Sequence, residues 1–136
     1  MTKLEIRMND EARMTNQAAT VTREFDLEER TARFGEEVIT FAKKVPLNEV
    51  TRPLIGQLVR AATSIGANYV EADDSDSKKD FRFKIGLCRR EAKETKHWLR
   101  MIVAAEPALK KPARPLWQEA KELNLIFGAI RRKNEA

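Results

Sequence analysis

The chain has 136 residues, 42% of them hydrophobic, which fits one soluble domain with its own core and excludes wholesale disorder. Its only cysteine, Cys88, excludes an internal disulfide, and no apolar run approaches the ~20 residues that span a bilayer, so we expect a cytoplasmic protein without a membrane partner. The net charge of +5 is unevenly distributed along the chain: residues 25–77 hold 10 acids and 6 bases, whereas residues 78–100 hold 9 bases and 3 acids. Such asymmetry suits a polyanionic partner, or contact between oppositely charged faces of subunits.

The folded domain is predicted to cover residues 25–136, because residues 1–24 lack periodicity and are expected to form a flexible N-terminal extension. Asp26 is a candidate N-cap for the first helix. Pro46 is expected to stop this helix, because the residue before a proline disfavours the helical conformation. Its seam, with a residue every three or four positions, reads Leu27, Thr31, Phe34, Val38, Phe41 and Val45, and Thr31 is its polar member.

The second helix is expected to start near Thr51, with Pro53 tolerated in its first turn. Two parallel apolar rows predict a wide buried face, and small residues such as Gly66 would permit close approach of a neighbouring helix. The main seam reads Leu54, Leu58, Ala61, Ile65, Asn68 and Ala72.

Asn68 is the polar member of that seam, and a buried amide without partners costs about 1–3 kcal/mol. Arg90, Glu91 or Glu94 of the third helix could supply those partners. We therefore expect Asn68, Glu91 and Glu94 to form a structural polar core that fixes helix register. The alternative is that these side chains line a functional polar pocket.

The third helix has the most regular pattern, with apolar residues at alternating steps of four and three, and Ser77 is its predicted N-cap. Residues 110–114 are expected to connect it to a fourth helix that begins at Pro115. All connections are short, which predicts an all-α, antiparallel up-down-up-down four-helix bundle. The third seam reads Phe81, Ile85, Cys88, Ala92, Thr95, Leu99 and Ile102, and the fourth reads Leu116, Ala120, Leu123, Phe127 and Ile130.

Two segments carry a resemblance to a known family: SIGANYVEA at residues 64–72, followed by KDF at residues 79–81, and RREAKET at residues 89–95, followed by Trp98. The chain resembles, from about residue 25 to 132, the four-helix bundle proteins encoded in bacterial 23S rRNA intervening sequences. Ala72 stands where family members often carry glycine. The resemblance implies a four-helix bundle that assembles into a ring-shaped homopentamer. It also extends to the accessory proteins of diversity-generating retroelements, which are basic and bind nucleic acid.

A basic stripe on the third helix lies one residue after successive seam positions, about 100° round the helix, and comprises Arg82, Arg89, Lys93, Lys96 and Arg100. Arginine grips phosphate in a bidentate way and lysine supplies a point charge, so these residues are candidate contacts to RNA or DNA. The alternatives are a solvated face, or salt bridges between subunits.

On the opposite flank of the same helix, Leu87 and Trp98 are large apolar residues off the main seam. An oligomer would cover them, so they are candidate subunit-interface residues. The alternative is that a neighbouring helix of the same bundle buries both.

No catalytic constellation, cofactor motif or metal site is predicted. Glu94 and His97 have the Glu-x-x-His spacing of di-iron bundles, but such sites need a second motif and His97 is the only histidine. The sequence therefore favours a non-enzymatic homo-oligomer that binds nucleic acid, RNA above all. Its rival is a protein-interaction scaffold that uses the basic stripe in subunit or partner contacts.

Overall fold

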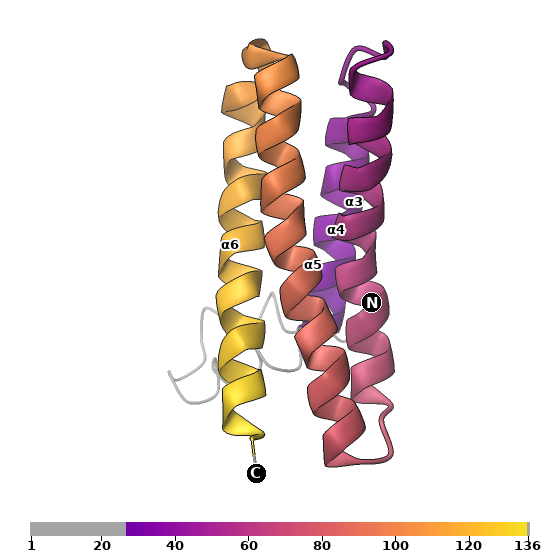
Figure 1. Ribbon diagram of the computed structural model, residues 1–136, viewed down its shortest axis with the longest axis vertical. Helices are drawn as coiled ribbons and strands as arrows, with labels where there is room; N and C mark the ends of the chain where they lie inside the picture. Colours follow the sequence, from indigo (N-terminus) through magenta and orange to yellow (C-terminus); the bar gives the residue numbers. More distant parts are fainter. Residues whose placement is uncertain (1–26, 136) are drawn as a thin grey trace, which may run out of the picture.

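The computed structural model describes residues 27–135, and within that range it consists of helices and short connections without a strand. The long helices are α3 (Leu27–Ala42), α4 (Thr51–Asp73), α5 (Lys78–Ala105) and α6 (Lys110–Lys133), with a short 3-10 helix η2 (Pro107–Leu109) before α6. Figure 1 shows the four long helices side by side along one axis. The predicted all-α four-helix bundle is confirmed, whereas the expected extension at residues 1–24 and the Asp26 cap lie outside the described residues.

Consecutive helices run in opposite directions, as Figure 1 shows. Gly86 of α5 faces Arg131 of α6, whereas Lys96 of α5 faces Trp117, so increasing numbers in one helix meet decreasing numbers in the other. The ion pairs between α4 and α5 follow the same rule. None of the described helices has the combined length and apolarity needed to cross a membrane.

The core lies along the predicted seams, because a stripe at 3–4 spacing faces one side of a helix and buries it against its neighbours. The seam of α5 is buried at every predicted position except Phe81, which is half-buried. The largest fully buried side chains of the bundle are Phe34, Leu58, Ile65, Ile85, Leu99, Ile102, Leu123 and Phe127.

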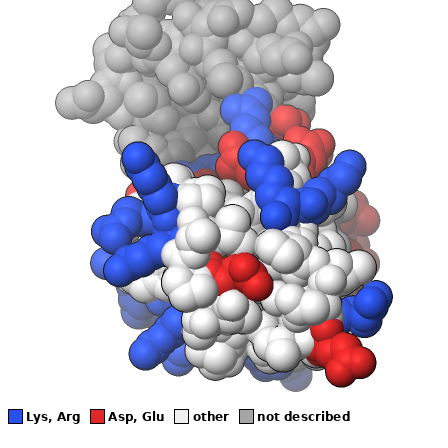
Figure 2. Space-filling view, turned by 90° about the horizontal axis from the view of Figure 1, so that it is seen from above, with Lys and Arg blue, Asp and Glu red and all other residues white. Residues whose placement is uncertain are grey.

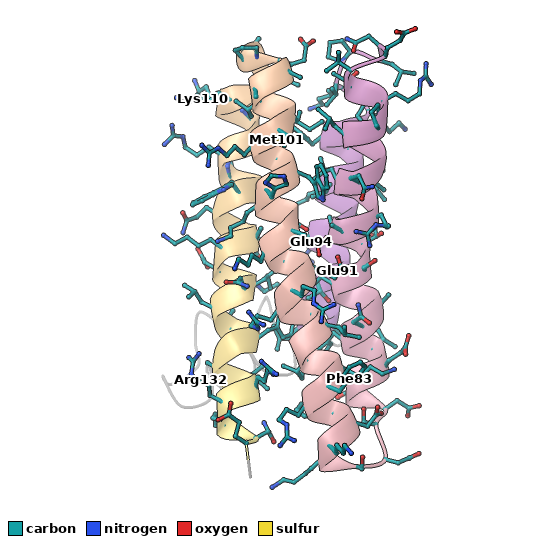
Figure 3. The ribbon with its side chains drawn as sticks, viewed as in Figure 1. Phe83, Glu91, Glu94, Met101, Lys110 and Arg132 are labelled. Atoms are coloured by element: carbon teal, nitrogen blue, oxygen red, sulfur yellow. The ribbon has the colours of Figure 1, made fainter. Side chains whose placement is uncertain are left out.

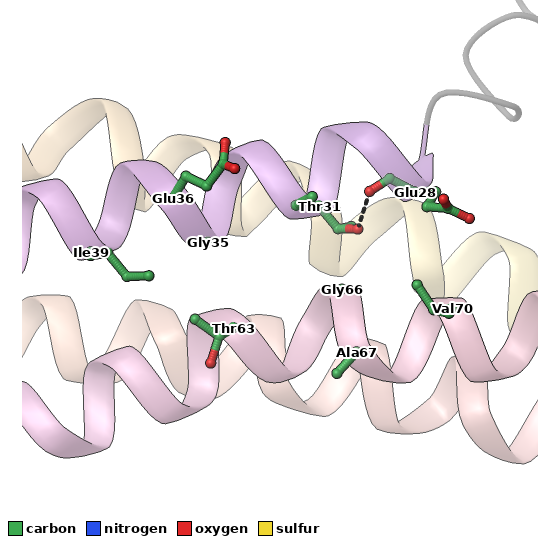
Figure 4. Close-up of a pocket in the computed structure, with 10 residues that line it drawn as sticks. Glu28, Thr31, Gly35, Glu36, Ile39, Thr63, Gly66, Ala67 and Val70 are labelled. Atoms are coloured by element: carbon green, nitrogen blue, oxygen red, sulfur yellow. Dashed lines mark hydrogen bonds between the residues drawn. The ribbon is translucent and has the colours of Figure 1, made fainter. Parts of the chain in front are cut away.

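Small residues bring α3 and α4 close together, as their presence in the sequence predicted. A Cβ atom added to Gly66 would lie 3.2 Å from Thr31 Oγ1, and one added to Gly35 would lie 3.6 Å from Thr63. Figure 4 shows these residues facing one another across an open groove of about 360 Å³ between the two helices.

The first helix ends earlier than predicted, at Ala42 instead of just before Pro46. Lys44 and Val45 donate their backbone N–H groups to carbonyls three residues back, so the chain tightens out of the α-helix before the proline. The helical conformation is disfavoured for the residue before a proline, which accounts for the end of α3 before Val45. Val45 remains buried in the core although it lies outside the helix.

The fourth helix begins earlier than predicted, at Lys110, so residues 110–114 are helical instead of forming a connector. Pro112 is the third residue of this helix, where an N–H group has no intrahelical partner to lose. Pro115 leaves only the carbonyl of Lys111 without its helical partner, and Lys111 is exposed to water. The extra turn also buries Ala113 in the core. The prediction omitted this turn because it placed the start of the helix at Pro115.

Candidate nucleic-acid interface

Two matching rows of side chains flank the seam between α5 and α6. Each row lies one residue after the apolar seam of its own helix, and both follow 3–4 spacing, so they line the same side of the antiparallel pair. The row of α5 reads Arg82, Gly86, Arg89, Lys93, Lys96, Arg100 and Val103, and the row of α6 reads Lys110, Arg114, Trp117, Lys121, Asn124, Gly128 and Arg131. We call the cations of these rows, together with Arg132, the basic strip.

At one end of the basic strip, arginines of the two helices lie over the helix pair. A Cβ atom added to Gly86 would lie 3.3 Å from Arg131 Nε, so the glycine makes room for this side chain to lie across α5. Arg82 Nη1 donates to the backbone oxygen of Asn134 at 3.2 Å, which ties α5 to the C-terminal end of α6. These contacts hold positive charge at the same end of both rows.

Arg89 lies in the middle of this arginine-rich end. A Cβ atom added to Gly128 would lie 3.6 Å from Arg89 Cδ and 3.4 Å from Arg132 Nη1. This glycine therefore also makes room for arginine side chains. Asn124 Nδ2 donates to the Arg89 backbone oxygen at 2.8 Å and fixes the two helices at this level. Arg89 Nε is buried and has no hydrogen-bond partner among the described residues.

Further along the strip, Trp117 stands on the surface of α6 between two lysines. Trp117 is 38% exposed. Lys96 Nζ lies 5.5 Å and Lys121 Nζ lies 5.7 Å from the centroid of its indole ring. Such distances are those of cation–π contacts. The ring lines an open hollow of about 280 Å³, whose other lining residues include the apolar Val103 and the cationic Arg100.

None of the basic-strip cations forms an ion pair with a carboxylate of the described residues. The ion pairs lie elsewhere: Arg30 joins α3 to Glu119 of α6 at 2.7 Å, and Arg60 joins α4 to Glu94 of α5 at 3.3 Å. The positive charge of the strip is therefore not neutralised within this part of the chain.

Figure 3 marks the length of the strip, with Lys110 near one end of α6 and Arg132 near the other. Figure 2 looks onto the end of the bundle nearer Lys110, and lysine and arginine side chains gather at the left of that view, on the side where Figure 1 places α6.

The strip includes the five cations predicted on α5, whereas Lys110, Arg114, Trp117 and Lys121 of α6 were missed. The available signal was the same as on α5, because Arg114, Trp117 and Lys121 each follow a residue of the apolar stripe of α6 by one position. The erroneous start of this helix at Pro115 concealed Lys110 and Arg114, which belonged to a supposed connector.

The candidate interface residues Leu87 and Trp98 are both half-buried, and Trp98 packs against the core of its own bundle. The Trp98 Nε1 atom is buried without a hydrogen-bond partner in the described range. The His97 and Trp98 rings pack edge to face, with their centroids 4.9 Å apart. Phe83 on the same helix is 59% exposed. Figure 3 shows Phe83 near one end of α5 and Met101 nearer the other.

The expected polar core is divided in the structure. Glu91 and Glu94 both face Arg60, at 3.5 and 3.3 Å, and Glu91 Oε1 is buried without a partner among the described residues. Asn68 is half-buried and donates its Nδ2 to the Ser64 oxygen of its own helix at 2.9 Å, not to the third helix. An asparagine can reach the carbonyl four residues back without crossing to a neighbour, which explains the difference.

Cys88 lies in the core, as its seam position predicted. Burial raises the pKa of the thiol to about 12, and its Sγ lies 3.6 Å from the Ile65 oxygen as a donor. The thiol is therefore neutral at physiological pH, and a neutral thiol is a poor nucleophile. Within residues 27–135 no group of three His, Cys, Asp or Glu side chains could hold a metal ion.

Comparison with known proteins adds to this geometry. The model of the family described as 23S rRNA-intervening sequence protein matches residues 23–128. The chain is also similar to a protein of unknown function from the S23 ribosomal protein family of Bacteroides thetaiotaomicron VPI-5482, known from a crystal structure. The two are 25% identical, the match covers 77% of this chain and 97% of that chain, and the TM-score is 0.68. No curated protein matches the sequence significantly.

Proposed function

Since the chain belongs to the family of 23S rRNA-intervening sequence proteins, we propose that it is a non-enzymatic, homo-oligomeric bundle that binds nucleic acid through the basic strip. RNA is the preferred ligand, because the family is described by its relation to sequences that interrupt a ribosomal RNA. The pentameric ring implied by the sequence resemblance is part of the proposal. A ring would repeat the strip and add avidity to weak single contacts.

The observation that carries the proposal is the two-helix row of cations that have no carboxylate partner within residues 27–135. Like charges held side by side repel one another, and a folded protein that keeps them together gains when a polyanion neutralises them. Phosphates are suitable partners, because arginine forms bidentate hydrogen bonds with them and lysine adds point charge. Such contacts bind the backbone and carry little base specificity of their own.

The length of the strip sets the size of the ligand. The α5 row runs from Arg82 to Val103, which at ~1.5 Å per residue is roughly 30 Å. A strand within a duplex, at ~3.4 Å per nucleotide, would cover it with roughly nine nucleotides. Probes of a dozen nucleotides or more therefore test the whole surface.

The first prediction concerns binding of labelled single-stranded RNA and duplex DNA to the purified protein, measured by fluorescence anisotropy across a salt series. The double variant K93E/R100E should weaken binding and reduce the slope of log Kd against log salt by about 1.4 for single strands, at about 0.7 per lost phosphate contact. Lys93 and Arg100 are chosen because both are exposed, so reversing their charge leaves the core intact.

The matched control is K43E/K44E, which makes the same change in net charge at two exposed lysines of the turn after α3 that do not belong to the strip. It should retain the wild-type slope. Equal weakening by both double variants would reduce the effect to net charge and overturn the assignment of the strip. An oligomer that binds neither nucleic acid at low salt would favour the protein-scaffold alternative.

A further inference from the structure

We propose that Trp117 is a stacking platform for one unpaired base, so that the basic strip selects single-stranded over duplex nucleic acid. This inference rests on the proposed function and specifies its ligand. It is drawn from the position of one aromatic ring among the cations and from the hollow beside that ring.

Trp117 is placed unlike an ordinary core tryptophan. Trp98 of α5 packs against the hydrophobic core, whereas Trp117 lies in the exposed row of α6 and is not among the residues packed on that core. A large apolar ring exposed in the middle of a charged row gains from being covered by a flat partner. Every nucleobase presents such a flat face.

The surroundings of the ring fit both the base and the phosphate of a nucleotide. The hollow beside it is lined by apolar residues, Leu99, Val103 and Ala113, and by cations, Arg100, Lys110 and Arg114. At about 280 Å³ it lies below the ~300–1,000 Å³ of pockets that enclose a drug-sized ligand, which suits one planar ring system. Positive charge all round disfavours a basic peptide as the occupant and favours a ligand with phosphates.

The two lysines explain how the ring is kept ready in the free protein. Lys96 and Lys121 each hold an ammonium group within 6 Å of the centroid of the indole ring, at cation–π distance. A base that stacks on the ring displaces one ammonium. Because lysine is flexible, that ammonium can then pair with the phosphate of the same nucleotide.

This arrangement distinguishes single strands from duplexes. The bases of a duplex are already stacked and paired, and removing one from the stack costs a few kcal/mol in free energy. A single strand presents its bases without that cost. Phosphate contacts along the rest of the strip act on both kinds of ligand.

The second prediction uses the full-length protein and two probes of equal length, oligouridylate and an abasic strand that keeps the phosphates. W117L should weaken oligouridylate binding about 5- to 150-fold, the range that corresponds to loss of one stacked base. It should leave abasic-strand binding and the salt slope unchanged. W117F should retain most of the wild-type affinity, because phenylalanine still offers an aromatic face.

F83L is the matched control, because Phe83 is an exposed aromatic residue of α5 outside the strip, and this variant should bind like wild type. Helix content by circular dichroism shows whether each variant is folded. Equal loss of both probes in W117L, or no loss of either, would overturn the stacking role while leaving phosphate binding by the strip intact. Failure of wild type to bind either probe would instead overturn the proposed function itself.

Discussion

The buried polar side chains within residues 27–135 are those of three threonines, and they differ in the hydrogen bonds that their hydroxyl groups form. Thr31 and Thr95 each donate to the carbonyl four residues back in their own helix, both at 2.7 Å. Those carbonyls already accept helical hydrogen bonds, so the hydroxyls add little. Thr51 instead donates to Pro46 O and accepts from Asn48 N at 3.0 Å, so it holds together the turn between α3 and α4.

The third prediction compares T51V with T95V, two substitutions of nearly equal shape. T51V should lower the free energy of unfolding by about 1–3 kcal/mol, because it removes the acceptor of the Asn48 N–H and the donor to Pro46. T95V should change it by less than about 1 kcal/mol. Urea unfolding measures both at one fixed protein concentration, so that the proposed self-association, which would make stability depend on concentration, affects both variants alike. Equal losses would contradict the special role of Thr51.

Sequence reasoning at this scale predicts the angular position of a residue better than its hydrogen-bond partner. The helical period placed Cys88 and Thr95 in the core, because 3–4 spacing fixes which side of a helix faces its neighbours. It gave Asn68 the wrong partner, since the amide could equally turn back along its own helix. That choice depends on the rotamer, which no spacing encodes.

At the scale of the element, α4 carries two glycines in different surroundings. Gly56 is exposed, and an added Cβ atom would have no neighbour within 4 Å. Gly66 faces α3, where Thr31 Oγ1 lies 3.2 Å from the same added atom. That hydroxyl is held by its bond to Leu27 O, so it cannot move aside freely. The same helix therefore contains one glycine without a structural role and one that sets the distance between helices.

The fourth prediction follows from this contrast. G56A should raise the free energy of unfolding by about 0.5–1 kcal/mol, because alanine is the better helix former and meets nothing. G66A should lower it by up to about 2 kcal/mol, because overpacking of about 1–3 kcal/mol outweighs the same gain in helix propensity. Thermal or urea unfolding at matched protein concentration measures the free energy of unfolding of both variants. A stabilising G66A would show that α3 and α4 can move apart at little cost in free energy.

Helix types and seams were predictable from sequence, and helix ends were less so. The ends depend on competition between proline geometry and burial of one more turn, as at Pro115, where burial of Ala113 extends α6 beyond the expected start. The predicted Ser77 cap is confirmed, because Ser77 Oγ accepts from Asp80 N at 3.0 Å. A side-chain cap is a local feature, so the local sequence suffices to identify it.

For the molecule as a whole, the two flanks of α5 differ in character. Toward α6 its exposed residues are cations without carboxylate partners in the described range, whereas toward α4 its carboxylates pair with Arg60. The second flank also carries Leu87 and Trp98 beside the exposed Phe83. Half of the candidate site was predictable because it lies on one helix. The other half required knowing which row of α6 faces it.

The fifth prediction concerns assembly, measured as the mass in solution by light scattering. Wild type should have a multiple of the protomer mass that persists at 0.5 M salt, and L87E should reduce it, because a buried carboxylate without a partner disfavours an apolar interface. L125E, at an exposed leucine of α6 that the interface assignment does not include, should retain the wild-type mass. A monomeric wild type would contradict self-association, and an assembly that loosens with salt would indicate contacts between opposite charges.

The short connection η2 has a consequence for how the basic strip could arise and change. All the cations of the basic strip come from residues 82–132, a single helical hairpin closed by the three residues of η2. Bringing the two rows together therefore closes only a small loop, which costs little chain entropy. Insertions in the turns on either side of α4 would leave the alignment of the rows untouched. One residue added to η2 would slide every cation of α6 past its counterpart on α5, so the length of this connection sets the spacing of the charge pattern.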